Sequence, residues 1–186
     1  ELNPDKDIIN LHPEHVPNKL EKAKTVIVDE ISMCRSDLFI WLSETLKLAE
    51  IKFKHPIQLV VVGDFYQLPP VLATPAEKEY FANGKVYAFN TAEWKSWHFQ
   101  PVVLHQVIRQ TNAEFSKALN SIRKGNTKYI HYLNSKSTKN PLNNAITVVS
   151  TNKEANTINL KKVNSLQGDW KIYNSQVSGK INDQDK

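Results

Sequence analysis

Two stretches, TVIVDEISM (residues 25–33) and LVVVGDFYQLPP (residues 59–70), decide the fold of this 186-residue chain. Each has a run of β-branched apolar residues that ends in one or two carboxylates. A run such as residues 26–28 is expected to be buried on both faces, as the central strand of a parallel sheet is. Asp29 and Glu30 then emerge at the carboxyl end of the strand, where ligands bind in open α/β sheets.

The segment between these stretches predicts how they pair. Residues 36–50 carry apolar side chains at helical spacing, with Ser36 as the expected N-cap, and residues 58–62 form the next expected strand. A strand–helix–strand order implies two parallel strands. Asp64 and Gln67 therefore emerge at the same edge as the first two carboxylates. Such an edge is typical of a nucleoside-triphosphate motor.

The rest of the chain predicts an α/β fold with mainly parallel strands. An amphipathic helix is expected over residues 112–124, with Gly125 as its stop, and another over residues 152–163. Further apolar strands are expected at residues 101–105, 145–149 and 168–173.

Composition narrows the class of protein. Cys34 is the only cysteine, so an intrachain disulfide is excluded. No apolar stretch approaches the roughly 20 residues of a membrane span, and an intracellular protein is expected. Residues 1–104 carry 11 Lys and Arg against 14 Asp and Glu, whereas residues 105–186 carry 13 against 5. The basic second part fits a surface that faces a polyanion, and it fits an ordinary solvated surface equally well.

The polar residues at the strand ends suit phosphoryl transfer, which requires positioning and charge neutralisation. Asp29 is placed to hold Mg²⁺, and Glu30 is placed to polarise an attacking water. Gln67 is a neutral donor and acceptor suited to sensing a γ-phosphate. Arg109, directly after an expected strand, can stabilise charge on that phosphate. Taken alone, the two acids also fit solvated residues that end a strand, and Arg109 fits an ordinary surface arginine.

Aromatic residues near these motifs are candidates for stacking on nucleic-acid bases. Phe65 and Tyr66 lie inside the second stretch. Trp94 and Trp97 are better explained as core residues, because each lies near an apolar face.

Together, these segments resemble superfamily 1 DNA helicases of the Pif and RecD group, and most closely the petite-integration-frequency (Pif) family. VIVDEISM (residues 26–33) resembles helicase motif II, and VVVGDFYQLPPV (residues 60–71) resembles motif III. VIRQ (residues 107–110) and FSKALNSIRKGN (residues 115–126) resemble motif IV and the helix after it. The resemblance implies a RecA-like fold and ATP-dependent unwinding of, or translocation on, single-stranded or forked DNA. It also implies roles in DNA repair, recombination and telomere maintenance.

The resemblance assigns a role to each candidate residue. Asp29 is the Mg²⁺ carboxylate, Glu30 the catalytic base, Gln67 the link between γ-phosphate and DNA, and Arg109 the arginine finger. The implied cofactors are ATP and Mg²⁺.

Tyr66 and Pro70 are the expected DNA contacts of motif III. The expected partner is single-stranded or forked DNA, with no membrane, and a monomer is expected.

One part of the family pattern is absent. The 186 residues contain no G-x-x-x-x-G-K-[ST] loop, which in the family precedes motif II and cradles the phosphates. The chain is therefore expected to be an internal fragment that is inactive alone. Residues 1–107 are expected to form the C-terminal part of a first RecA-like lobe, and residues 108–186 the N-terminal part of a second.

Two other functions stay open at this point. One is a helicase-derived module that binds single-stranded nucleic acid without hydrolysis, which the missing loop favours. The other is a different nucleotide-hydrolysing motor, such as one coupled to a nuclease, against which the GDFYQLPP string argues.

Overall fold

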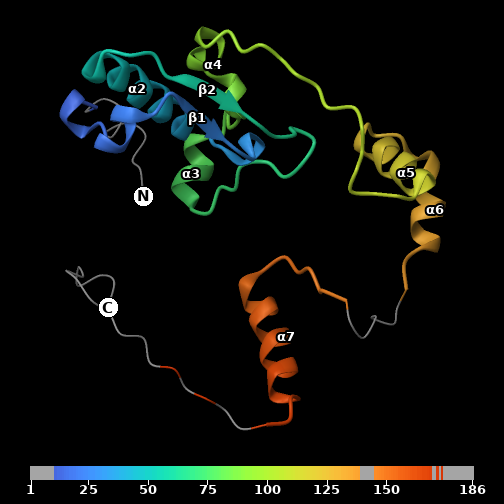
Figure 1. Cartoon of the computed structure of the whole chain (residues 1–186). Coiled ribbons are helices and arrows are strands. Elements are labelled where there is room, and N and C mark those ends of the chain that lie inside the picture. Colours follow the sequence, from blue (N-terminus) through green and yellow to red (C-terminus); the bar gives the residue numbers. More distant parts are fainter. Residues whose placement is uncertain (1–10, 139–144, 169–170, 172, 174–186) are drawn as a thin grey trace. The chain divides into compact units, whose positions relative to one another are not determined.

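The computed structural model describes residues 11–138, 145–168, 171 and 173 (Figure 1). The chain divides into two compact units between Ile130 and His131. The described elements, in chain order, are η1 (Pro13–His15), η2 (Asn18–Lys22), β1 (Thr25–Val28), η3 (Ile31–Met33), α2 (Ser36–Phe53), β2 (Gln58–Val61), α3 (Pro75–Tyr80), η4 (Ala88–Asn90), α4 (Ala92–Ser96), α5 (Ala113–Arg123), η5 (Thr127–Tyr129), α6 (Ile130–Ser135) and α7 (Asn152–Asn164).

The predicted strand–helix–strand unit is confirmed. β1 and β2 pair in parallel, in a register that runs from Thr25 opposite Gln58 to Val28 opposite Val61. α2 connects them and packs along the pair (Figure 1). Its Phe39, Leu46 and Ala49 are fully or almost fully buried, and they form the centre of the core.

The expectation that residues 26–28 are buried on both faces is wrong for the described part of the chain. Val26 and Val28 pack against the core below α2, but Ile27 between them is 66% exposed. Successive side chains of a strand point to opposite faces, and α2 covers only one face of this two-stranded sheet. β1 therefore alternates between half-buried and exposed positions.

The strands expected at residues 101–105 and 145–149 are wrong as well. Neither segment has regular secondary structure, and Val102, Leu104, Ile146 and Val148 are all highly exposed. A strand needs a neighbour to hydrogen-bond with, and in the described residues the sheet contains only β1 and β2. Half of the third expected strand, residues 168–173, lies outside the described residues.

The expected helices form, with small differences at their ends. α5 and α7 match the prediction closely, and Gly125 adopts a φ of 75° after α5. α2 begins at Ser36, but its N-cap is Arg35 and not Ser36 as expected. The Ser36 hydroxyl instead donates to the carbonyl oxygen of Lys85 at 2.8 Å. The short helix α3 was not expected.

The division between the two compact units lies C-terminal of the expected lobe boundary at residues 107 and 108. α5 belongs to the first unit by contact, although the resemblance assigns it to the second lobe. Where the lobes of the whole protein divide stays a prediction.

Candidate functional site

The segments that follow β1 and β2 continue side by side beyond the sheet. The amide of Val62 donates to the carbonyl of Val28 at 2.8 Å, and the amide of Ile31 donates to the carbonyl of Val62 at 3.0 Å. These two bonds bracket Asp29 and Glu30. The predicted catalytic acids therefore lie against the start of the GDFYQLPP segment.

Glu30 adopts an unusual backbone conformation. Its φ of 51° and ψ of 44° lie in the left-handed region, which is uncommon for residues other than glycine. The preceding Asp29 accepts a hydrogen bond from the Glu30 amide through Oδ1 at 2.8 Å. Both side chains are exposed. Such strained residues cluster at functional sites, because the surrounding structure holds them in place.

Gly63 is the point of closest approach between the two segments. A Cβ atom there would lie 2.9 Å from the amide nitrogen of Ile31 and 3.0 Å from its Cγ2. Its φ of 159° is also one that other residues rarely adopt. The site therefore requires glycine at this position.

Asp64 organises the loop that follows Gly63. Its Oδ1 accepts from the amide of Tyr66 at 3.0 Å, and its Oδ2 accepts from Nε2 of Gln67 at 3.3 Å. Its carbonyl oxygen accepts from the amide of Gln67 at 2.8 Å. One carboxylate thus fixes both the backbone of the loop and the predicted γ-phosphate sensor.

Arg123, the last residue of α5, meets this loop. A guanidinium nitrogen donates to Oδ1 of Asp64 at 2.6 Å. The guanidinium carbon also lies 4.9 Å from the centre of the Tyr66 ring, within the range of a cation–π contact. No pattern in the sequence pointed to this pairing, because the two residues are 59 positions apart in the chain.

Phe65 and Tyr66 have different environments. The Phe65 ring packs edge-on against Phe89 at 4.9 Å and against Trp94 at 6.0 Å, so it anchors the loop to the core. Tyr66 is 70% exposed. Its accessibility agrees with the expected contact to DNA, which stays a prediction.

The two tryptophans near these motifs and Pro70 are less accessible than Tyr66. Trp94 and Trp97 pack against the core, as expected, and Nε1 of Trp97 donates to Oγ of the buried Ser43 at 2.9 Å. Pro70 is buried, which disfavours its expected contact with DNA.

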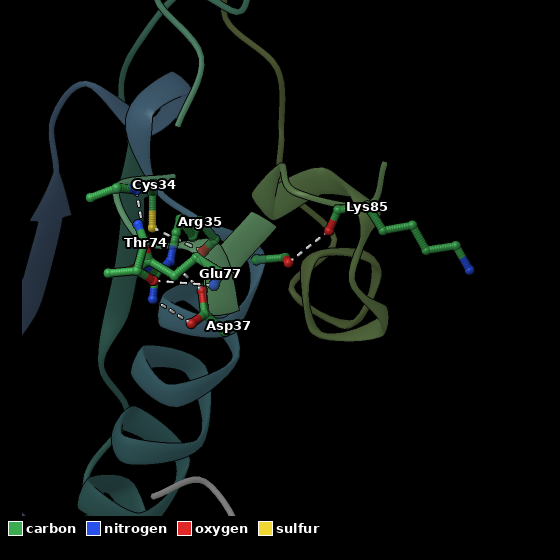
Figure 2. Close-up of polar contacts among 8 residues, drawn as sticks. Cys34, Arg35, Asp37, Thr74, Glu77 and Lys85 are labelled. Atoms are coloured by element: carbon green, nitrogen blue, oxygen red, sulfur yellow. Dashed lines mark hydrogen bonds and ion pairs between the residues drawn. The ribbon is translucent and has the colours of Figure 1, made fainter. Parts of the chain in front are cut away.

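A largely buried ion-pair network supports the segment directly after Glu30 (Figure 2). Arg35 forms two hydrogen bonds to Asp37, at 2.8 and 3.0 Å, and a third to Glu77 of α3. The hydrogen bond to Asp37, above all, raises the pKa of the Arg35 guanidinium. Hydrogen bonding by the Thr74 amide, above all, lowers the pKa of Glu77. Sequence reasoning missed this network because Glu77 lies 42 positions from Arg35 in the chain.

Cys34 lies beside the same network. Burial, together with the nearby Asp37 charge, raises the pKa of its thiol to about 11. A thiol of this kind stays protonated at neutral pH and is a poor nucleophile.

Arg109 is an exposed residue of the segment between α4 and α5. None of the ion pairs among the described residues joins it to the other candidates. Its role as arginine finger stays a prediction.

The donor set suits a magnesium ion held together with substrate phosphates. No group of three or more His, Cys, Asp or Glu residues in the described ranges forms a metal site. Mg²⁺ keeps several waters and commonly uses one or two carboxylates plus phosphate oxygens. Asp29 fits that requirement, because its side chain is exposed. Its Oδ1 accepts a hydrogen bond from the Glu30 amide, which orients the carboxylate.

Residues 4–132 match the family model of the PIF1-like helicases. The chain is 32% identical over 165 residues to the ATP-dependent DNA helicase Pif1 of Campylobacter jejuni, with 85% of this chain and 36% of that protein covered. It is 31% identical over 173 residues to the ATP-dependent DNA helicase PIF1 of Emericella nidulans, with 89% of this chain and 22% of that protein covered. The chain thus spans only about a fifth to a third of the length of these curated relatives.

Solved structures show the same fold. A chain from a structural study of DNA unwinding at forked dsDNA by two coordinating Pif1 helicases superposes with a TM-score of 0.71 at 27% identity, covering 95% of this chain and 44% of that one. The Pif1 helicase from Bacteroides in complex with ADP-AlF3 and ssDNA gives a TM-score of 0.61 at 27% identity, covering 81% of this chain and 37% of that one. The expected RecA-like α/β class is confirmed by these neighbours. Separately, none of the helices in the described ranges is both long and apolar enough to cross a membrane.

Proposed function

The chain belongs to the PIF1-like helicase family, and from this membership we propose that it is part of an ATP-dependent enzyme that unwinds DNA or moves along it. The observation that carries the proposal is the junction of the two strand ends. There the Ile31 amide and the Val62 carbonyl hold the Asp29–Glu30 pair against the Asp64 loop, which we define as residues 63–68. A nucleotide-hydrolysing site needs its metal carboxylate, its base and its phosphate sensor at one such edge.

Each residue has a proposed role at this edge. Asp29 holds Mg²⁺, which when bound neutralises charge on the phosphates of ATP. Glu30 accepts a proton from the attacking water, and Gln67 binds the γ-phosphate and links it to the DNA. Arg109 contributes positive charge to the transition state when the two lobes close. The strained backbone of Glu30 supports this assignment.

The proposed partner is DNA, either single-stranded or forked. The structural neighbours were solved with ssDNA and described at forked dsDNA, which supports both forms. Tyr66 is proposed to contact the strand, since its ring is largely exposed beside the nucleotide edge. The protein is also proposed to act as a monomer and inside the cell.

An ATPase assay tests the assignment of Glu30. In a longer protein that joins this segment to a phosphate-binding loop, E30Q is expected to retain ATP binding and to lower turnover by ~10²–10⁴-fold, because the amide cannot accept a proton. E79Q, which neutralises an exposed glutamate of α3, is the matched control and is expected to turn over normally. Normal turnover by E30Q would show that Glu30 is not the base.

A second function is favoured by the largely exposed ring of Tyr66, which is available for stacking on a base. It is single-stranded DNA binding without hydrolysis. The chain by itself is expected to show no ATP turnover with oligo-dT, because Asp29 and Glu30 alone would present negative charge to a polyanion. Turnover above that of E30Q would contradict this expectation, and oligo-dT binding that ATP leaves unchanged would support the binding module.

A further inference from the structure

We propose that Arg123 is a positioning residue that holds the Asp64 loop in the conformation in which Tyr66 and Gln67 act. The inference rests on the proposed function, which it deepens by naming a residue that controls the site from α5. In sequence, the expected lobe boundary at residues 107 and 108 lies between Asp64 and Arg123. The contact thus links the motif III loop to the helix that follows motif IV.

The proposal starts from two contacts made by one side chain. Arg123 donates to Oδ1 of Asp64 at 2.6 Å, and its guanidinium carbon lies 4.9 Å from the centre of the Tyr66 ring. Asp64 in turn accepts from the Tyr66 amide and from Nε2 of Gln67. Arg123 therefore contacts Tyr66 directly. It is also linked to both Tyr66 and Gln67 through the hydrogen bonds of Asp64.

The exposed fractions of Asp64 and Tyr66 indicate which of the two side chains is accessible to a ligand. The Asp64 side chain is 19% exposed, so its oxygens are committed to the loop. Tyr66 remains 70% exposed although the guanidinium lies over its ring, so most of the ring is accessible. A base can stack on the open face while the guanidinium supports the other face.

The two ends and the packed face of α5 fix the position of Arg123. Asn112 caps the start of the helix by accepting from the Phe115 amide at 2.9 Å. The buried Ala118 lies on the packed face of the helix. Gly125 ends it with a left-handed turn, in which its amide donates to the carbonyl of Ile122 at 2.8 Å. Arg123 is thus the last residue of a helix that is defined at both ends.

The alternative role for Arg123 is a simple contact to a DNA phosphate, or a surface ion pair without effect. Lys124 provides the control, because it carries the same charge at the neighbouring, exposed position. R123Q and K124Q each remove one positive charge, but only R123Q removes the contacts to Asp64 and Tyr66. D64N weakens the same link from its other end.

Hydrogen exchange of the free 186-residue chain tests the positioning role without DNA. In R123Q and D64N, the amides of Tyr66 and Gln67 are expected to exchange about three- to tenfold faster than in the wild type, because the loop loses its ion pair and cation–π contact. K124Q is expected to exchange like the wild type. Equal rates in R123Q, D64N and wild type would overturn the proposal.

Fluorescence anisotropy with labelled oligo-dT then tests the consequence for binding. R123Q is expected to bind about three- to tenfold more weakly than K124Q at the same salt concentration, with the same salt dependence. Adding R123Q to Y66A is expected to cause no loss beyond that of K124Q in Y66A. Equal weakening by R123Q and K124Q would reduce Arg123 to a phosphate contact and overturn the proposal. If the wild type does not bind oligo-dT, the proposed function fails, whereas hydrogen exchange still decides the role of Arg123.

Discussion

At Gly63 the segments that follow β1 and β2 approach so closely that no side chain fits between them. The nearest atom to a new Cβ is the backbone nitrogen of Ile31, which itself donates to the carbonyl of Val62 and cannot move freely. Gly84 differs, because a Cβ there would meet nothing within 4 Å although its φ is 75°. A comparison of alanine substitutions at Gly63 and Gly84 therefore distinguishes the cost of steric crowding from the cost of the backbone conformation.

We expect G63A to lower the free energy of unfolding by ~2–4 kcal/mol, because it combines backbone strain with a clash against Ile31. G84A is the control, with an expected loss of ~1 kcal/mol from its left-handed backbone alone. Urea unfolding followed by tryptophan fluorescence measures both variants. Equal losses would mean that the strand ends separate without cost.

Glu77 makes stability depend on pH. Hydrogen bonds from the Thr74 and Ala73 amides, followed by the ion pair with Arg35, lower its pKa below the ordinary 4.5. A group with a lowered folded-state pKa contributes stability that is fully present above its unfolded pKa and is lost as the pH falls through the folded pKa.

The stability difference between the wild type and E77Q is therefore expected to be constant above about pH 5 and to shrink below about pH 4.5. Urea unfolding at a series of pH values measures it. E79Q, on the same helix, is the control. A difference that grew on acidification would reverse the sign and contradict the hydrogen-bond pattern.

At the scale of the element, α5 is the helix that carries Arg123, the partner of Asp64 in the candidate site. Its N-cap is Asn112, whose side chain accepts a hydrogen bond from the Phe115 amide, and its last residue is Arg123. Without the cap, the first turn would leave amide groups without partners. The helix also packs few buried side chains, with only Ala118 fully buried, so its ends matter more than usual.

N112A is expected to lower the free energy of unfolding by ~1 kcal/mol, whereas N112D is expected to stay close to the wild type because aspartate caps equally well. Hydrogen exchange of residues 113–117 provides the local measurement, and N112A should speed it. Unchanged exchange in N112A would show that tertiary packing alone holds the start of α5.

At the scale of the whole molecule, charge is the feature that separates the two parts of the sequence. The excess of Lys and Arg after residue 104 predicts that this part contributes most of the attraction to DNA. α7 carries two of these charges, Lys161 and Lys162, at its C-terminal end, where the helix dipole also favours cations. Binding to DNA and simple helix stabilisation are therefore both possible reasons for them.

Oligo-dT binding by the complete chain separates the two reasons. If both lysines meet phosphates, K161Q/K162Q should weaken binding and make the salt dependence shallower by about 0.7 for each phosphate that is no longer neutralised. K19Q/K22Q removes two exposed lysines of the acidic part and serves as the control. Equal effects of the two double variants would contradict the prediction that the part after residue 104 contributes most of the attraction to DNA.

The sequence by itself determined the strand–helix–strand unit, the helices α5 and α7, and the meeting of the two motifs. These depend on local periodicity and on the rule that parallel strands end at one edge, so neighbouring residues encode them. The same local signal failed at residues 101–105 and 145–149, because an apolar run becomes a strand only when another strand pairs with it. The assignment to the helicase family also came from these motifs, and the family match confirmed it.

Only the tertiary structure decided the left-handed backbone of Glu30, the burial of Pro70 and the pairing of Arg123 with Asp64. Asp64 and Arg123 are 59 positions apart in the chain. A surface arginine at a helix end has the same sequence signature whether it meets water, phosphate or a carboxylate. Its partner is chosen by how α5 and the Asp64 loop pack, and that choice depends on distances in space that no local pattern contains.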